Sequence, residues 1–218
     1  MHCGFFQEVE KTLMQIGKRN CFARNQIKKM KNIIIFGAPG SGKGTQSDKI
    51  IAEFGVEHIS TGDVLRAEIK AGTELGNVAA SYINDGNLVP DSLIIDILAS
   101  VLDSKGKDIE GVIFDGFPRT IPQAEALDKM LQERGEEVSV VIGLEVDDAE
   151  LVKRIVARGK TSGRADDNEE TAKKRLSTYY AQTLPLKDFY IAQGKYAKIH
   201  GMGSIEEIYA DISKAIKG

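Results

Sequence analysis

The sequence has little of what several classes of protein depend on. Only two cysteines occur among its 218 residues, Cys3 and Cys21, and two cysteines alone do not make a metal site. No apolar run has the length of a membrane-spanning helix. The formal net charge of −3 argues against the broad basic face that nucleic-acid-binding proteins use. These absences predict a protein of the reducing cytoplasm that has neither a membrane nor a nucleic acid as its partner.

Histidine is scarce as well. The three histidines, His2, His58 and His200, are scattered along the chain, so each is expected to have a surface or packing role. No internal repeat or low-complexity tract is evident. The length, with 42% apolar and 28% charged residues, is typical of one substantial α/β domain with insertions.

Residues 1–29 differ in composition from the rest of the chain. They carry six lysines and arginines against Glu8 and Glu10, and they contain both cysteines. The segment lacks the apolar centre of a secretory signal and has too many acidic and too few serine residues for a transit peptide. We expect a dispensable extension outside the core, since Met30 directly precedes the first apolar run; a regulatory or membrane-touching arm is the alternative.

A phosphate-binding loop is predicted at residues 33–45, with the sequence IIIFGAPGSGKGT. Four apolar residues suit a strand buried in a parallel sheet, and the glycines that follow let the backbone wrap closely around an anion. The apolar spacing of residues 46–54 indicates a helix whose N-terminus adds its partial positive charge. Lys43 would then reach the outer phosphates of a nucleotide.

The match to the P-loop pattern departs at one position. Gly37, Gly42 and Lys43 fit, but Gly44 stands where the pattern has serine or threonine, and the hydroxyl follows at Thr45. This shift suggests a magnesium ion held mainly by phosphate oxygens and water. A glycine-rich turn without a ligand remains the alternative, and no GxGxxG dinucleotide loop can be placed here.

The rest of the chain alternates strands with helices. Strands are expected at residues 56–60, 111–115, 138–146 and 196–200, with helices between them and a final helix that Ser204 and Glu207 cap. The helix that begins at Asp147 should end at Gly159, and Pro185 should interrupt a helix over residues 169–190. Polar residues 160–167 should form a mobile flap. This alternation predicts a parallel sheet covered on both faces, with ligands at the carboxyl ends of its strands.

Arginine is the residue that most suggests the ligand. Seven arginines follow Lys43, and a guanidinium grips phosphate oxygens in pairs, so several arginines suggest several phosphates. We assign Arg134, flanked by Glu133 and Glu136, to a surface ion pair, and the same alternative is serious for Arg154. Asp115, at the end of a strand, stands where a carboxylate would orient magnesium through water, unless it only caps the next turn.

Four segments together resemble the adenylate kinase family, in the family's order and spacing. They are GAPGSGKGTQ at 37–46, STGDVLR at 60–66, DGFPRTIPQA at 115–124 and SGRADDNEETAKKRL at 162–176. The resemblance covers residue 31 to the C-terminus. It implies a three-layer P-loop kinase fold over residues 30–218, with a core at 30–59, 90–156 and 168–218, a monophosphate-binding insertion at 60–89 and a short lid at 157–167.

The resemblance also implies a role for individual residues. On the ATP side these are Gly40, Ser41, Gly42, Lys43, Gly44, Thr45, Arg158 and Gly203. On the AMP side they are Thr61, Arg66, Asn87, Leu88, Val89, Gly116, Phe117, Pro118, Arg119, Gln123, Arg164 and Arg175. The charges that stabilise the transferring phosphoryl group are Lys43, Arg119, Arg154, Arg158, Arg164 and Arg175.

The activity implied by the resemblance is reversible phosphoryl transfer from Mg-ATP to AMP by a cytoplasmic monomer. The short lid lacks the longer insertion that carries zinc-binding cysteines in some members, so no zinc is expected. Thr61, Thr120 and Gln123 favour AMP over UMP and CMP, because the related uridylate-cytidylate kinases differ at these positions. A kinase for another nucleoside monophosphate and a non-catalytic nucleotide sensor remain the alternatives.

Overall fold

The structure is a computed structural model that describes residues 31–105, 109–162 and 166–218. Its centre is a parallel sheet with the strand order β2-β3-β1-β4-β5. The strands are β1 (Lys31–Gly37), β2 (Glu57–Ser60), β3 (Gly111–Asp115), β4 (Val138–Glu145) and β5 (Tyr196–His200). The predicted bounds of β3 and β5 are right to the residue, and the predicted three-layer α/β fold is confirmed.

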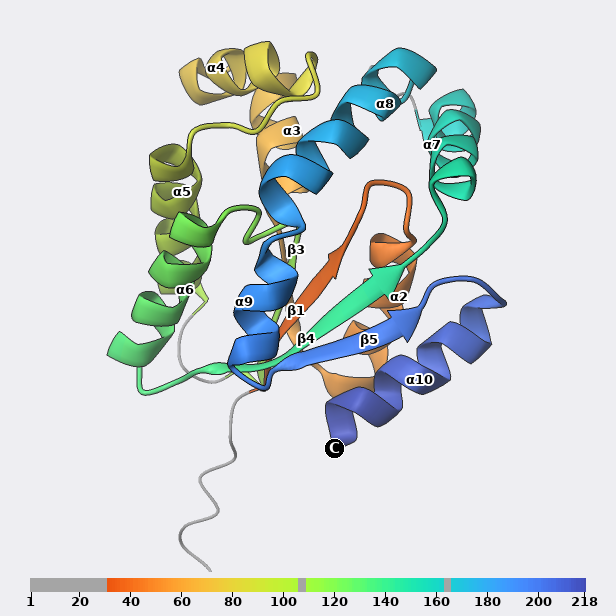
Figure 1. Ribbon diagram of the computed structural model, residues 1–218. Helices are drawn as coiled ribbons and strands as arrows, with labels where there is room; N and C mark the ends of the chain where they lie inside the picture. The colour runs from red at the N-terminus through yellow and green to blue at the C-terminus, as the bar shows by residue number, and fades with distance from the viewer. Residues whose placement is uncertain (1–30, 106–108, 163–165) are drawn as a thin grey trace, which may run out of the picture.

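Helices cover both faces of the sheet (Figure 1). They are α2 (Lys43–Phe54), α3 (Thr61–Ala71), α4 (Glu74–Ile83), α5 (Asp91–Ser104), α6 (Ile121–Glu133), α7 (Asp148–Ser162), α8 (Glu169–Thr178), a π-helical turn η1 (Tyr179–Thr183), α9 (Leu186–Ala192) and α10 (Ile205–Lys217). Helices α5, α6 and α9 pack on one face, and α2 and α10 pack on the other. Within the described residues, no helix combines the length and the apolar character needed to cross a bilayer.

Strand β1, which contains the apolar run of residues 33–36, is the central strand of the sheet. Successive side chains of a strand point to opposite faces, and here both faces are buried. Ile34 and Phe36 join the core under α5, α6 and α9, whereas Ile33 and Ile35 join the core under α2 and α10. The strand pairs with β3 on one side and β4 on the other, so the loop that follows it lies at the topological switch point of the sheet.

Helices α3, α4, α7 and α8 lie beyond the carboxyl end of the sheet rather than on its faces (Figure 1). The expectation that α7 ends at Gly159 is wrong, because the helix continues to Ser162. Gly159 is instead a point of close approach: a Cβ there would lie 2.2 Å from the carbonyl oxygen of Asp167. Gly159 therefore does not end the helix; it allows the backbone at Asp167 to pack closely against α7.

The polar segment expected to form a mobile flap, residues 160–167, begins within the last turn of α7, and its mobility stays a prediction. Residues 163–165 lie outside the described residues, but residues 160–162 belong to α7, and Asp166 and Asp167 are buried. Burial without apolar side chains is tolerated here because both carboxylates form ion pairs with arginines. The polarity of Asp166 and Asp167 therefore belongs to a charged interior, whereas residues 160–162 are exposed to water.

The helix expected over residues 169–190 is interrupted earlier than Pro185 predicts. Helix α8 passes into η1, where the amide of Leu184 donates to the carbonyl of Tyr179 at 2.8 Å. Pro185 then precedes α9, where its missing N–H costs no helical hydrogen bond. The predicted capping box of α10 is confirmed, because Ser204 and Glu207 each bond the backbone of the other.

Candidate functional site

The loop between β1 and α2 has the backbone that a phosphate cradle needs. Gly40 and Gly42 adopt left-handed conformations with φ of 84° and 94°, which side chains other than glycine rarely allow. A Cβ at Gly40 would also lie 2.8 Å from the carbonyl oxygen of Leu151, so the loop is held close to α7. Helix α2 begins at Lys43, and its first N–H groups, which have no acceptor within the helix, face the loop.

Lys43 is folded back onto this loop. Its Nζ donates to the carbonyl oxygens of Gly37 at 2.8 Å and Ala38 at 3.1 Å. Burial lowers its pKa to about 8, and although Asp115 opposes this shift, Arg119 and Arg175 add to it. The ammonium thus stands in a region that already has an excess of positive charge and would gain from an anion.

Asp115 ends β3 and lies in register with Ile35 of β1, beside the phosphate loop. Burial works to raise the pKa of its carboxyl, but His58 and Lys43 outweigh that effect and hold the pKa below its ordinary value. Nε2 of His58 lies 3.7 Å from Oδ2 of Asp115, an ion-pair distance. Sequence reasoning missed His58, because only the pairing of β2 with β3 brings the two residues together.

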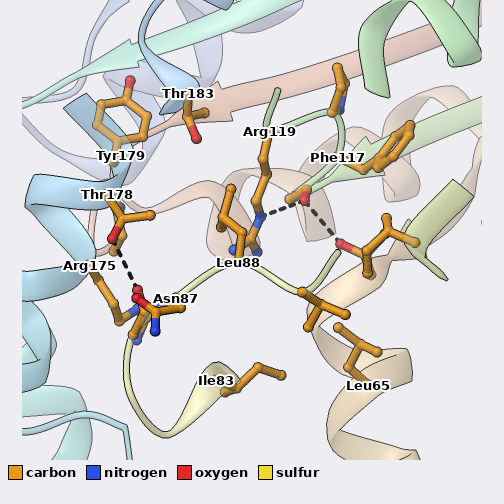
Figure 2. Close-up of a pocket in the computed structure, with 18 of the residues that line it drawn as sticks. Leu65, Ile83, Asn87, Leu88, Phe117, Arg119, Arg175, Thr178, Tyr179 and Thr183 are labelled. Atoms are coloured by element: carbon orange, nitrogen blue, oxygen red, sulfur yellow. Dashed lines mark hydrogen bonds between the residues drawn. The ribbon is translucent and has the colours of Figure 1, made fainter. Parts of the chain in front are cut away.

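A pocket opens at the carboxyl end of the sheet, between the phosphate loop, α3 and the α8–η1 segment (Figure 2). Most residues predicted for the AMP side line it: Thr61, Arg66, Asn87, Leu88, Val89, Gly116, Phe117, Pro118, Arg119, Gln123 and Arg175. Arg164 lies outside the described residues. Sequence reasoning did not single out Leu65, Ile83, Thr178, Tyr179 and Thr183, which also line the pocket. These aliphatic, aromatic and threonine side chains also occur in ordinary cores, so the local sequence does not show that they line a pocket.

Arg119 is fixed inside the pocket by the loop that follows β3. Its Nε donates to the carbonyl oxygen of Gly116 at 2.8 Å, and the hydroxyl of Thr61 donates to the same oxygen at 3.0 Å (Figure 2). Burial lowers the pKa of Arg119 to about 10, and Arg175 adds to this effect. The guanidinium remains charged at neutral pH, so the pocket holds a cation that is oriented before any ligand arrives.

Gln123 is the buried amide of the pocket, with 2% of its surface exposed. Its Oε1 accepts from the backbone amide of Arg119 at 2.8 Å, and its Nε2 donates to Oδ1 of Asp91 at 2.7 Å. The hydroxyl of Thr120, the N-cap of α6, donates to the other oxygen of Asp91 at 2.8 Å. The first turns of α5 and α6 are therefore joined at this point.

Two further site arginines are held by a pair of aspartates. Asp167, whose side chain is fully buried, accepts from Nε and Nη2 of Arg158, both at 2.6 Å. Its Oδ1 also accepts from Nη1 of Arg175 at 3.2 Å, and Asp166 accepts from the same nitrogen at 2.8 Å. The bond to Asp167 raises the pKa of Arg158, whereas burial lowers that of Arg175. The carboxylates thus hold two like charges side by side.

The remaining predicted residues lie outside the pocket. Arg154 forms an ion pair with Glu150 at 2.8 Å and donates to the carbonyl of Gly201 at 3.4 Å. Gly44 and Thr45 are exposed on the first turn of α2, and Gly203 precedes the cap of α10. Arg134 forms the predicted surface ion pair, with Asp103 as its partner. The described residues contain no group of three histidine, cysteine, aspartate or glutamate side chains that could hold a metal ion.

Comparison with known proteins identifies the family. The family model described as adenylate kinase matches residues 35–195. An adenylate kinase of Phocaeicola vulgatus is 65% identical over 188 residues, covering 86% of this chain and 99% of that protein. Those of Bacteroides fragilis and Porphyromonas gingivalis are 64% and 54% identical over 187 residues, covering 86% of this chain and 98% and 96% of those proteins. The chain belongs to the adenylate kinase family.

Proposed function

We propose that the chain catalyses reversible transfer of the terminal phosphoryl group of Mg-ATP to AMP, giving two ADP. The observation that carries the proposal is the convergence of Lys43, Arg119 and Arg175 on one pocket, from the phosphate loop, the loop after β3 and α8. With Arg66, four cations line this cavity, which suits a ligand with several phosphates. The relatives named adenylate kinase support the same activity.

The chemistry asks for alignment more than for acid–base catalysis. A phosphate oxygen of AMP is anionic near neutral pH and attacks without a general base, so the task of the protein is to position two nucleotides and stabilise charge. Lys43 would contact the donor phosphates and Arg119 the AMP phosphate. Arg158 and Arg175 would approach the transferred group from α7 and α8, with Arg154 and Arg164 as further candidates. Closure of residues 157–167 would exclude water, which would otherwise accept the phosphoryl group.

AMP is proposed to occupy the pocket next to Gln123. Leu65, Val89 and Phe117 would provide apolar contacts for the base, and Arg66, Arg119 and Arg175, which line the same pocket, would bind the phosphate. ATP is proposed to bind at the loop of residues 40–45 with Arg158 and the backbone of Gly203. Magnesium fits the carboxylate of Asp115 at the end of β3, which would hold the ion through water and so help to neutralise the phosphates.

Monomeric state and cytoplasmic location remain part of the proposal. A pyrimidine monophosphate kinase is the second candidate for the acceptor, and a non-catalytic nucleotide sensor is the alternative of another class. The presence of Lys43, Asp115 and the pocket arginines favours an enzyme over a sensor, because a sensor needs affinity without the charges that stabilise a transition state.

The test is ADP formation from Mg-ATP with AMP, CMP, UMP or dTMP, with a control that contains no acceptor. We expect rapid turnover with AMP and little in the control. Arg119→Ala should lower kcat/KM by a factor that corresponds to about 3 kcal/mol or more, because it removes a charge from the AMP phosphate. If Arg119→Ala turns over like the wild type, the role assigned to Arg119 is refuted. If the wild type prefers a pyrimidine nucleotide, that nucleotide and not AMP is the acceptor.

A further inference from the structure

The amide of Gln123 has only one orientation that satisfies both of its neighbours. Asp91, when ionised, can only accept a hydrogen bond, and the backbone N–H of Arg119 can only donate one. The nitrogen of the amide therefore faces Asp91 at 2.7 Å, and its oxygen faces Arg119 at 2.8 Å. A flipped amide would place a donor against a donor and an acceptor against an acceptor. Because Gln123 is 2% exposed, water is poorly placed to compensate for either loss.

This orientation fixes what the amide can offer to a ligand. A primary amide has two N–H donors and two acceptor lone pairs, and each neighbour uses one of them. One N–H and one lone pair remain on a residue that lines the pocket. The other amide of the lining, Asn87, is exposed and its side chain has no comparable pair of partners among the described residues. The amide of Gln123 therefore presents its remaining N–H and its remaining lone pair at fixed positions, unlike the amide of Asn87.

We propose that Asp91 is a specificity-determining positioning residue, which locks the amide of Gln123 so that the pocket selects a 6-aminopurine over a 6-oxopurine. The inference rests on the proposed function and deepens it. In a 6-aminopurine the amino group donates beside a ring nitrogen that accepts, so it pairs with the oxygen and the N–H of the amide. A 6-oxopurine presents an acceptor beside a ring N–H, which is the reverse order.

Asp91 is well placed for this task. It opens α5, where a negative charge is stabilised by the partial positive charge of the helix N-terminus. Its second oxygen is engaged by the hydroxyl of Thr120, which keeps the carboxylate from turning away from Gln123. Both bonds reach across to the first turn of α6, so the carboxylate also fixes the distance between the two helix ends.

The test compares AMP with IMP, because the two nucleotides differ only along the edge in question. In the chain with Asp91→Leu, whose side chain branches at the same atom but has no acceptor, we expect the ratio of kcat/KM for AMP to that for IMP to fall about tenfold or more. The KM for ATP should stay unchanged. Asp91→Asn keeps an oxygen toward Gln123 and can donate to the hydroxyl of Thr120, so it should restore most of the ratio. Asp96→Asn, exposed on the same helix, is the matched control for charge.

A double-mutant cycle separates a role through Gln123 from a general structural role. In a Gln123→Ala background, Asp91→Leu should change the AMP-to-IMP ratio no further. An equal change in both backgrounds would overturn the proposal, as would a folded Asp91→Leu chain with the wild-type ratio or an Asn variant that loses as much as the Leu variant. If Asp91→Leu does not fold, Asp91→Ala takes its place with the same expectations.

Failure of the proposed function would look different. Wild-type protein that transfers no phosphoryl group to AMP would refute the activity but leave the role of Asp91 open to measurement. In that case the Kd values of AMP and IMP, measured by titration calorimetry on the same set of variants, decide the inference. If the preference for AMP over IMP disappears in Asp91→Leu and persists in Asp91→Asn, the inference about Asp91 is supported. If the preference is unchanged in both variants, the inference is overturned.

Discussion

Lys43 is charged at neutral pH, although its burial disfavours the charged form. The pKa of about 8 means that the ammonium of the unliganded protein is protonated at neutral pH and loses its proton at mildly alkaline pH. The folded pKa lies below the unfolded value of 10.5, so burial of the charged form costs stability below pH 8, and that cost is relieved as the pH rises toward 10.5. A nucleotide phosphate nearby would favour the charged form.

We therefore expect kcat/KM for ATP, which reports the free enzyme, to fall above pH 8, by about tenfold per pH unit once the lysine is largely neutral. The value of kcat should fall less, because bound phosphates keep Lys43 protonated. The measurement is a pH profile of both constants between pH 6 and 10. Lys43→Arg, which stays charged over this range, should lose the alkaline limb; an identical limb in both proteins would assign it to another group.

Asp167 is the carboxylate that Arg158 of α7 and Arg175 of α8 have in common, and Arg175 also pairs with Asp166. Replacing it with asparagine removes the charge that Arg158 and Arg175 share, while the shape is kept. We expect a loss of about 2–3 kcal/mol in the free energy of unfolding, below the usual cost for a buried pair because Arg158 is 37% exposed.

Bound nucleotide should reduce the loss in the free energy of unfolding caused by Asp167→Asn, since phosphate oxygens replace the missing carboxylate as partners of the arginines. The measurement is chemical denaturation of the wild type and Asp167→Asn, with and without a bisubstrate analogue. Glu169→Gln, which breaks an exposed ion pair with Lys173, is the control and should leave the stability unchanged. A stability loss that nucleotide does not reduce would show that Asp167 serves folding alone.

At the scale of secondary structure, α7 shows how a glycine that predicts a helix end can have another role. Glycine in a helix interior normally costs about 0.5–1 kcal/mol relative to alanine. At Gly159 the balance is reversed, because the methyl group of alanine would meet the backbone of Asp167 at 2.2 Å. The chain must pass this point closely for Asp167 to reach Arg158.

We expect Gly159→Ala to lower the free energy of unfolding by about 1–3 kcal/mol, through overpacking. Gly44→Ala in α2, where no atom lies within 4 Å of the added methyl group, is the control and should be neutral or stabilising. Thermal unfolding of both variants measures the difference. If Gly159→Ala were the more stable of the two, the close approach would not be a constraint on the folded protein.

At the scale of the whole molecule, the sheet begins at Lys31, whose amide donates to the carbonyl of Glu110 at 3.0 Å. The family match lies within residues 35–195 and so does not include residues 1–29. We expect a chain that starts at Met30 to fold and turn over like the full-length chain. Its melting temperature should differ by about 3 °C or less, which corresponds to less than about 1 kcal/mol for a domain of this size. A large loss of melting temperature or activity would show that the extension packs on the core.

Several features were predictable because their signals are local. The apolar runs, the glycines of the phosphate loop and the cap residues each act over a few neighbouring positions, so β1, β3, β5 and the cap of α10 follow from the sequence. The order of the motifs was enough to indicate the family. Most predicted AMP-side positions line one pocket, because loops that follow parallel strands meet at one edge of the sheet.

Other features depend on segments that are distant in the sequence. The pairing of β2 with β3 brings His58 to Asp115, and the docking of α5 against α6 brings Asp91 to Gln123. The return of the chain past Gly159 buries Asp167 between two arginines. The sequence by itself determined the fold class, the phosphate loop and the family, since these rest on local patterns. Only the tertiary structure decided how the polar groups are paired, because each pair joins side chains whose distance is set by the packing of whole elements.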